Sequence, residues 1–306
     1  MNSKQTRLDV DNAFVSTQLE YVRASALEPP TIPFKGRQLI PTNNAVPEGA
    51  ESYTYRQYDL IGKADWIGDK ADDLPSVNTT STEVTIKPYT FGTSYEFSRQ
   101  ELLAAQYANV PLDARKSAAA RRAIEQFFDA VAQSGDTAHG LKGLLNQSGT
   151  CTYTVPADGT GFSKLWAAKT GDLVLRDMHG IAQQIVTDTN EVEAPDTLVL
   201  PTTAFALIAT TPFSDYSEDS ILSVFLRASR YITTVVPWSA CDAGKAMTAY
   251  RRSPEVLEHV IPAEFTQLPM ESRKSSLEFF TACLGRTAGV CVYRPKAICY
   301  SDGIIA

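Results

Sequence analysis

The sequence predicts an α+β fold with a projecting two-stranded element, one long helix and a mixed body. Residues typical of strands dominate two segments between positions 51 and 97. A stripe of apolar residues at helical spacing follows from Leu112. Beyond it short helices and strands alternate, and strands prevail near the C-terminus. Because no internal repeat is visible, this order favours an α+β body over a doubly wound parallel sheet.

Residues 1–50 are expected to form an N-terminal arm. A short helix over 9–23 suits its start, but prolines interrupt the remainder and keep its backbone out of a central sheet. Such an arm has no core of its own, so we expect it to lie on its own body or on a neighbour. The prolines are Pro29, Pro30, Pro33, Pro41 and Pro47.

Residues 51–97 are expected to form an extended loop of two long polar strands. Tyr53–Leu60 mark the first strand, and Val84–Phe97 mark the second. The tip between them, residues 62–78, is rich in Gly and Asp. The polarity of both strands suits a two-stranded element with solvent on one side.

A long helix is the strongest helical prediction. Ser98 and Glu101 have the spacing of a capping box, which predicts a helix start that continues to about Tyr107. A second helix is predicted from Leu112, and Gly135 is its expected end. Its apolar stripe consists of Ala120, Ala123, Ile124, Phe127 and Val131.

The rest of the chain is predicted to mix shorter elements. The expected helices lie around Met178–Ile185, Phe205–Ile208 and Ile221–Leu226. The expected strands are Thr197–Leu200, Ile232–Val236, Ala246–Tyr250, Leu277–Leu284, Val290–Tyr293 and Ala297–Tyr300.

The charge balance excludes some functions. The chain has 35 acidic and 28 basic residues, a net charge of −7. A dedicated nucleic-acid-binding protein needs a surplus of Lys and Arg on one face, whereas a container benefits from a wall that does not trap an enclosed polymer.

No stretch has the roughly 20 apolar residues of a membrane helix, and Met1–Leu8 lacks a signal-peptide core. We therefore expect the subunit to stay in the cytoplasm where it is made.

The five cysteines are an odd number without CxxC spacing, so they predict neither a disulfide framework nor a zinc site. Cys283, Cys291 and Cys299 lie in apolar runs. We expect these three to be buried strand residues.

Motifs of catalysis are missing from the sequence. It contains neither common phosphate-binding loop, and no GxSxG or HExxH motif. His139, His179 and His259 lie far apart, which favours a structural or surface role for each. Two groups of acidic residues, at 72–73 and 215–219, could bind a cation. The group at 215–219 precedes an apolar helical run, so capping of the helix N-terminus is favoured there. The sequence therefore predicts no catalytic, cofactor-binding or metal-binding residue.

Candidate contact residues lie on the loop and the long helix. A large aromatic such as Trp66, at the tip of a projecting loop, has nothing of its own to pack on. Either the loop folds back over the body or the tip docks on another subunit, where Trp and Tyr are favoured anchors. The basic pair Arg121–Arg122 suits a solvated face or a salt bridge between subunits. The candidates are Tyr53, Tyr55, Lys63, Trp66, Lys70, Arg121 and Arg122.

The order of arm, extended loop, long helix and mixed body resembles that of the major capsid proteins of tailed bacteriophages, which have the Hong Kong 97-like fold. Short stretches carry this resemblance over about residues 50–304. None is catalytic, and their order and spacing make the match specific. They are Tyr58–Ala64, Glu101–Ala105, Lys116–Ala120, Gly140–Asn146, Thr197–Pro201 and Tyr300–Ile304.

The resemblance implies how the body divides and what it does. A peripheral domain would hold the long helix over 98–172 and 239–285, and an axial domain would span 173–238 and 286–306. The subunit would self-assemble into pentamers and hexamers of an icosahedral virion shell, built in the host bacterial cytoplasm. The shell would enclose double-stranded DNA without sequence-specific binding. Scaffolding, portal and decoration proteins are further partners of such shells.

Related capsids leave two points open. Some crosslink a loop Lys to an Asn of a neighbour, and Lys63 and Lys70 lie in the corresponding loop, but no partner residue can be matched and no crosslink is predicted. One alternative function is an encapsulin, a compartment of the same fold that encloses a cargo enzyme. A metal-dependent hydrolase that uses the histidines or acidic clusters is the alternative from a different class.

Overall fold

The computed structural model describes residues 33–64, 66, 76–107, 112–214, 216, 218–244, 246–272 and 278–305. The chain divides into two units, Met1–Pro33 and Phe34–Ala306, and the fold below is that of the second unit. The helix expected over 9–23 lies outside the described residues. The described part of the expected arm contains a single helical turn, α2 (Gly36–Leu39), and a short edge strand, β1 (Thr42–Asn43).

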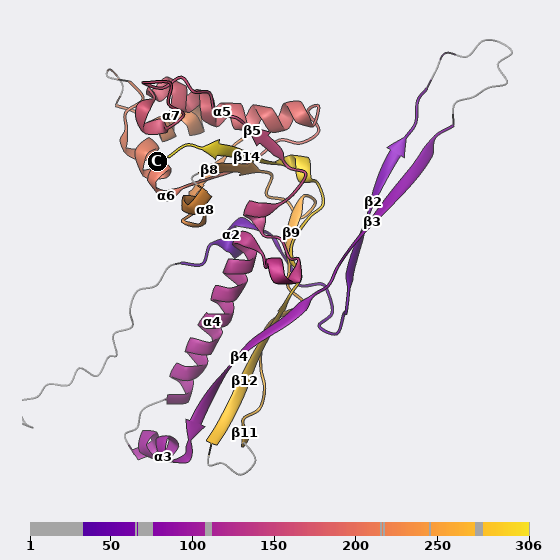
Figure 1. Ribbon diagram of the computed structural model, residues 1–306, viewed down its shortest axis with the longest axis vertical. Coiled ribbons are helices and arrows are strands. Elements are labelled where there is room, and N and C mark those ends of the chain that lie inside the picture. Colours follow the sequence, from indigo (N-terminus) through magenta and orange to yellow (C-terminus); the bar gives the residue numbers. More distant parts are fainter. Residues whose placement is uncertain are drawn as a thin grey trace, which may run out of the picture. The chain divides into compact units, whose positions relative to one another are not determined.

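A five-stranded mixed sheet lies at the centre of the largest core cluster (Figure 1). Its strands in spatial order are β5 (Cys151–Tyr153), β14 (Ile298–Gly303), β8 (Ala246–Tyr250), β6 (Thr197–Leu200) and β7 (Thr234–Pro237). Strand β6 is buried along its whole length, because helices cover both faces of the sheet. Leu198 and Leu200 pack with one group of helices, and Val199 packs with the other.

Helices of opposite faces come from different parts of the chain. On the face of Leu198, α5 (Gly171–Asp188), α6 (Thr202–Thr210) and α7 (Ile221–Ala228) supply buried residues. On the face of Val199, α8 (Ala240–Gly244) and α2 supply them. Figure 1 shows α5 and α7 on one side of the sheet and α8 and α2 on the other.

The long helix packs against a pair of long antiparallel strands. Strand β4 (Tyr89–Ser98) pairs antiparallel with β12 (Glu278–Thr287) over their full length, and β10 (Ala263–Gln267) and β11 (Glu271–Ser272) flank β12. The spine helix α4 (Leu112–Ser134) packs against this sheet. Before it, α3 (Arg99–Tyr107) begins at the predicted capping box. Ser98 and Glu101 each accept the other's backbone N–H at 3.1 Å, so that prediction is confirmed.

The buried face of α4 differs slightly from the predicted stripe. Ala120, Ile124 and Val131 are buried as expected, whereas Ala123 is exposed, so the prediction for Ala123 is wrong. Phe128, which is 1% exposed, fills the core instead of Phe127, which is 40% exposed. The prediction for Phe127 is wrong because Phe128 packs into the core of the β4–β12 sheet, while Phe127 lies outside that core and contacts Phe91 with ring centroids 4.1 Å apart.

The end of α4 is set by glycine, as predicted. Gly135 has φ +69°, and a Cβ there would lie 2.2 Å from the carbonyl oxygen of Leu141. Only glycine adopts this conformation without strain and leaves room for the returning chain. The short helices of the unit are η1 (Thr137–His139), η2 (Leu144–Asn146), η3 (Trp166–Ala168) and η4 (Pro295–Ala297).

The extended loop contains one hairpin and not the full predicted pair of strands. Strand β2 (Tyr53–Ile61) pairs with β3 (Asn78–Ile86). The single second strand predicted over 84–97 is wrong, because it splits at Pro88 into β3 and β4, which belongs to the spine sheet. Proline lacks the N–H that a continuous ladder requires, so the chain changes sheets there. Figure 1 shows β2 and β3 side by side, running away from both larger sheets.

A small sheet joins the hairpin to the body. Strand β9 (Leu257–Val260) lies between β1 and β13 (Gly289–Val292), parallel to the first and antiparallel to the second. The other predicted strands and helices of the body are present with shifted ends. Cys283, Cys291 and Cys299 are buried on β12, β13 and β14, as the sequence predicts.

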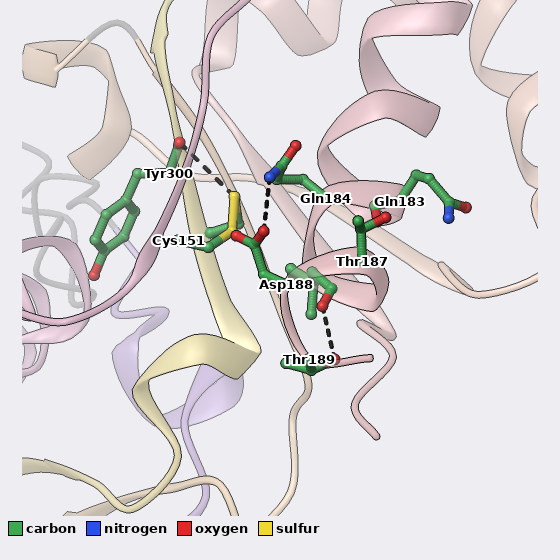
Figure 2. Close-up of a disulfide and its surroundings, with 9 residues drawn as sticks. Cys151, Gln183, Gln184, Thr187, Asp188, Thr189 and Tyr300 are labelled. Atoms are coloured by element: carbon green, nitrogen blue, oxygen red, sulfur yellow. Dashed lines mark hydrogen bonds between the residues drawn. A yellow bond between two sulfur atoms is a disulfide. The ribbon is translucent and has the colours of Figure 1, made fainter. Parts of the chain in front are cut away.

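The prediction of no disulfide framework needs one correction. Cys151 and Cys299 form a disulfide between β5 and β14, with their Cα atoms 4.5 Å apart (Figure 2). The two strands pair in parallel with these residues directly opposite each other. A separation of 148 residues hides this pairing from the sequence. The bridge ties an edge strand to the C-terminal strand of the same sheet.

Candidate assembly surfaces

Tyrosines anchor the base of the hairpin to the body. The Tyr53 hydroxyl lies 2.7 Å from that of Tyr293, which in turn donates to Glu258 Oε2 at 2.8 Å. The ring of Tyr55 packs edge-on against Tyr293 with centroids 4.8 Å apart, and Gln57 Nε2 donates to the Tyr293 carbonyl. Burial raises the pKa of Tyr53 and Tyr55, so both hydroxyls stay protonated at neutral pH. Both tyrosines thus have partners within their own chain, and their contact with a neighbour stays a prediction.

The outer part of the hairpin is solvated. The first six residues of β3 are exposed, and all of them carry polar side chains. Trp66 is fully exposed, so the alternative in which the loop folds back and covers it is wrong. Lys63 is also exposed, and Lys70 lies outside the described residues. This leaves a projecting polar ribbon with an uncovered aromatic beyond its end.

The two predicted arginines of the spine stack on aromatic rings. The Arg121 guanidinium lies 5.6 Å from the ring centroid of Phe265, and that of Arg122 lies 6.0 Å from the ring of Phe34. Both distances suit cation–π interaction. Arg121 remains exposed and Arg122 half-buried. These contacts hold the guanidinium groups at the surface of α4, and a salt bridge to another subunit stays a prediction.

The histidines lie on separate elements and form no common site. His139 pairs with Asp136 at 2.6 Å on an exposed turn. His179 packs against Phe225 with ring centroids 4.9 Å apart, and burial lowers its pKa. His259 is fully buried, and the same cause lowers its pKa to about 4. Among the residues that the structure describes, no group of three or more His, Cys, Asp and Glu side chains could hold a metal ion.

A serine caps the start of α7, and Asp219 of the acidic cluster pairs with an arginine of that helix. Ser220 is the N-cap residue, and its Oγ accepts from the Ser223 N–H at 3.3 Å. Asp219 instead pairs with Arg227 at 2.9 Å. The capping prediction is therefore wrong for Asp219, because a serine one residue later takes that place. Asp215 and the pair at 72–73 lie outside the described residues.

The helices give no sign of a bilayer-spanning segment. Within the described part of the chain, none is both long enough and apolar enough to cross a membrane.

A family comparison decides what these surfaces belong to. The family described as major capsid protein matches residues 62–304, most of the chain. The chain belongs to the major capsid protein family. It is a structural subunit of a phage capsid shell, and neither the encapsulin nor the hydrolase alternative is favoured.

Solved capsid structures share the fold of this capsid subunit. A chain of the capsid of Myoviridae phage XM1 superposes with a TM-score of 0.80 at 20% identity, covering 94% of this chain and 98% of that one. A Mycobacterium phage Adephagia chain gives 0.66 at 12% identity, with 99% of both chains covered. The capsid of an empty GTA particle gives 0.64 at 10% identity, covering 99% and 100%. No curated protein matched the chain. The fold is Hong Kong 97-like.

Sequence reasoning missed the loop before α5 in this capsid subunit. Gly159-Thr160-Gly161-Phe162 presents a large aromatic between glycines and a serine, and Phe162 is 88% exposed. The same signal singled out Trp66. Lys169 and Asp177, which form a fully buried ion pair nearby, gave no signal because they lie eight residues apart across a loop and a helix start.

Proposed function

We propose that the subunit assembles, without catalysis of its own, into pentamers and hexamers that close an icosahedral shell. The family match over residues 62–304 carries this proposal, since it includes the second strand of the hairpin, the spine and the main sheets. Closed shells of identical subunits need heterologous contacts, in which different surfaces of each subunit meet. The shell would enclose the phage double-stranded DNA, and a chain of net charge −7 suits enclosure without sequence-specific binding.

We assign roles to the parts of the subunit as the resemblance implies. The peripheral domain comprises 98–172 and 239–285, and the axial domain comprises 173–238 and 286–306. The arm and hairpin are the parts that overlap neighbours. An isolated two-stranded hairpin is marginally stable in water, so this one gains most from a neighbouring surface. Assembly takes place in the host cytoplasm, with scaffolding, portal and decoration proteins as further partners of the virion.

Electron microscopy and sedimentation of the purified full-length chain test the proposal. We expect closed shells, or rings of five and six subunits, in negative stain, and matching fast-sedimenting species. A uniform monomer or dimer at every concentration and salt, even with a co-expressed scaffold, would refute assembly. Deletion of 62–78 is expected to leave a folded subunit that forms no shells.

A gentler variant separates docking from folding at the hairpin tip. Trp66→Ala removes a fully exposed side chain, so its thermal midpoint should equal that of the wild type while assembly weakens. Trp66→Phe keeps an aromatic anchor and serves as the matched control. Equal shell yields from all three proteins would show that Trp66 makes no contact between subunits.

A further inference from the structure

Backbone strain in the described part of the chain is concentrated at the two ends of α5. Phe162, with φ +62°, lies in the loop before this helix. Asn190 and Glu191, with φ +50° and +66°, directly follow its last turn. These three are all the non-glycine residues of positive φ among the described residues. Such strain persists only where the surrounding structure imposes it, and it clusters at functional sites.

The loop before α5 presents Phe162 to solvent. The Phe162 N–H donates to the Gly159 carbonyl at 2.9 Å, and the Gly159 N–H donates to the Ser163 carbonyl at 3.0 Å. These bonds close a tight turn that directs the aromatic ring outward, with 88% of the residue exposed. Burial therefore gives no reason for a bulky residue at this strained position, where asparagine or glycine would fit more easily.

Buried charges fix this loop to the first two turns of α5. The side chains of Lys169 and Asp177 are fully buried and lie 2.6 Å apart. Lys169 also pairs with Asp158 at 3.1 Å, and Arg176 bonds to both aspartates. These bonds hold the pKa of Asp158 at about 2, so the network stays charged at neutral pH. Every charge of the network is paired, and the Lys169–Asp177 pair is fully buried, so Phe162, the knob of this loop, is held in one place.

A recess lies at the opposite end of α5. Its volume is about 530 Å³, and apolar atoms form most of its accessible wall, although charged residues such as Asp188, Arg294 and Lys296 also line it. Val192 at its edge is 72% exposed, although it is an aliphatic residue. The recess is lined by residues of the turn after α5, by Gly149 and by η4, including Val192, Pro295 and Ala297.

The recess is as firmly built as the knob. Thr189 Oγ1 donates to the Ile185 carbonyl at 2.7 Å and closes the last turn of α5. Glu193, which is 3% exposed, pairs with Arg251 at 2.9 Å and with Arg294. Figure 2 shows the disulfide of Cys151 beside Asp188 and Thr189 at this end of the helix. These bonds fix the walls of the recess, so the recess is already formed in the free subunit.

A subunit cannot fill its own recess. The loop is fixed at Asp177, and the recess begins at Asp188, eleven residues further along the helix. At 1.5 Å per residue these positions are about 17 Å apart.

We propose that Phe162 of one subunit docks in the α5 recess of the next subunit, so that identical contacts close the rings of five and six. This inference rests on the proposed function and names the contact that builds its rings. A knob and a recess at opposite ends of one helix form the head-to-tail contact that ring closure requires.

A designed crosslink tests the contact directly. The variant Thr160→Cys/Val192→Cys keeps Phe162 and places one thiol beside the knob and one at the recess, since Thr160 is exposed in the same loop. Within a subunit these positions are too far apart for a disulfide, which needs Cα atoms within about 7 Å. Oxidation of assembled protein with diamide should give covalent ladders that end at five and six subunits on a denaturing gel. Each single-cysteine variant is the control and should give no ladder beyond a dimer.

Substitutions of the knob separate docking from folding. Phe162→Ala should lower the yield of rings and shells at least roughly tenfold, as expected of a central aromatic anchor. Phe162→Gly should assemble as poorly while its thermal midpoint rises, because glycine relieves the strain at positive φ.

The outcomes distinguish this contact from the proposed function. Wild-type shells with normal shells from Phe162→Ala, or shells of the double-cysteine variant that yield no ladder, would overturn the docking and leave the recess to another occupant. A wild-type chain that never assembles would sink both the contact and the proposed function.

Discussion

The two-stranded β2–β3 sheet and the five-stranded sheet are built on opposite principles. In the larger sheet, β6 is buried along its entire length, and helices cover both faces. In the hairpin, the first six residues of β3 are exposed and polar. The base of the hairpin contacts the body through tyrosines, which bind Tyr293 and the backbone of β13. One region is held by apolar burial and the other by backbone pairing and a few hydrogen bonds.

This difference suggests a division of roles, in which the covered sheet stabilises the fold of the subunit and the hairpin is available for contact with another subunit. A sheet with both faces covered gains its stability from its own chain. A solvated hairpin gains little, since two strands alone are marginal in water. We propose that a neighbouring subunit supplies the free energy that the hairpin still lacks. Substitutions in the first region should therefore change folding, and those in the second should change assembly.

The largest expected effect comes from Phe225→Ala in the covered sheet. Phe225 is fully buried on α7, and truncation of a buried phenylalanine costs about 3–5 kcal/mol through lost burial and a residual cavity. Urea denaturation followed by tryptophan fluorescence should show the loss, because Trp166 and Trp238 are buried in the body.

The matched substitution in the hairpin is Ser81→Ala. Ser81 is exposed on β3, so its replacement should change the free energy of unfolding by no more than about 0.5 kcal/mol. Similar losses from Phe225→Ala and Ser81→Ala would show that both regions draw on one core, and the comparison would fail.

Acid should weaken the body through His259. This residue is fully buried, with Nε2 3.1 Å from Thr287 Oγ1, and burial followed by the charge of Arg37 lowers its pKa to about 4. In the unfolded chain this histidine has the ordinary pKa near 6.5. Between about pH 6.5 and 4 the unfolded chain therefore binds a proton at His259, whereas the folded chain keeps it neutral. Stability is therefore complete above about pH 6.5 and falls as the pH drops toward 4, with about 2 kcal/mol lost between pH 7 and 5.

A variant isolates this contribution from that of the carboxylates. His259→Gln cannot take up the proton, so its free energy of unfolding should fall less between pH 7 and 5. Denaturation curves of both proteins at several pH values measure the difference. Parallel pH profiles would mean that His259 is not responsible.

Local signals in the sequence were sufficient for the spine and its start. The capping box at Ser98, the glycine at 135 and the 3.6-residue period all act within a few residues of chain, and the structure confirms them. The choice between Phe127 and Phe128 was wrong because both fit a helical stripe. Only the position of the β4–β12 sheet decides which of them is buried.

Features that depend on distant pairing could not be predicted. The disulfide needs β5 and β14 to lie in parallel register, and β4 pairs outside the hairpin with β12, which follows about 190 residues later. Of the candidate contact residues, Trp66 could be predicted as exposed from its place in a loop, which needs no tertiary information, and its contact with another subunit stays a prediction. Phe162 carries the same local signal, but its importance depends on strain and on a recess that only the folded chain reveals.

A smaller effect than that of His259 is expected at the base of the hairpin, in Tyr53→Phe. This change removes one hydrogen bond to Tyr293, which still donates to Glu258, so no buried donor is left unpaired and the cost is about 1 kcal/mol. Because the bond joins only the hairpin base to the body, urea denaturation should barely change, whereas backbone amides of β2 and β3 should exchange with solvent about fivefold faster in the free subunit.

Tyr58→Phe on the same strand, where the side chain is exposed, is the control and should leave exchange unchanged. In assembled shells the difference should disappear, since a neighbour then holds the hairpin. If faster exchange spread into β6 and β8, the hairpin would be part of the core after all, and its supposed dependence on a neighbour would be refuted.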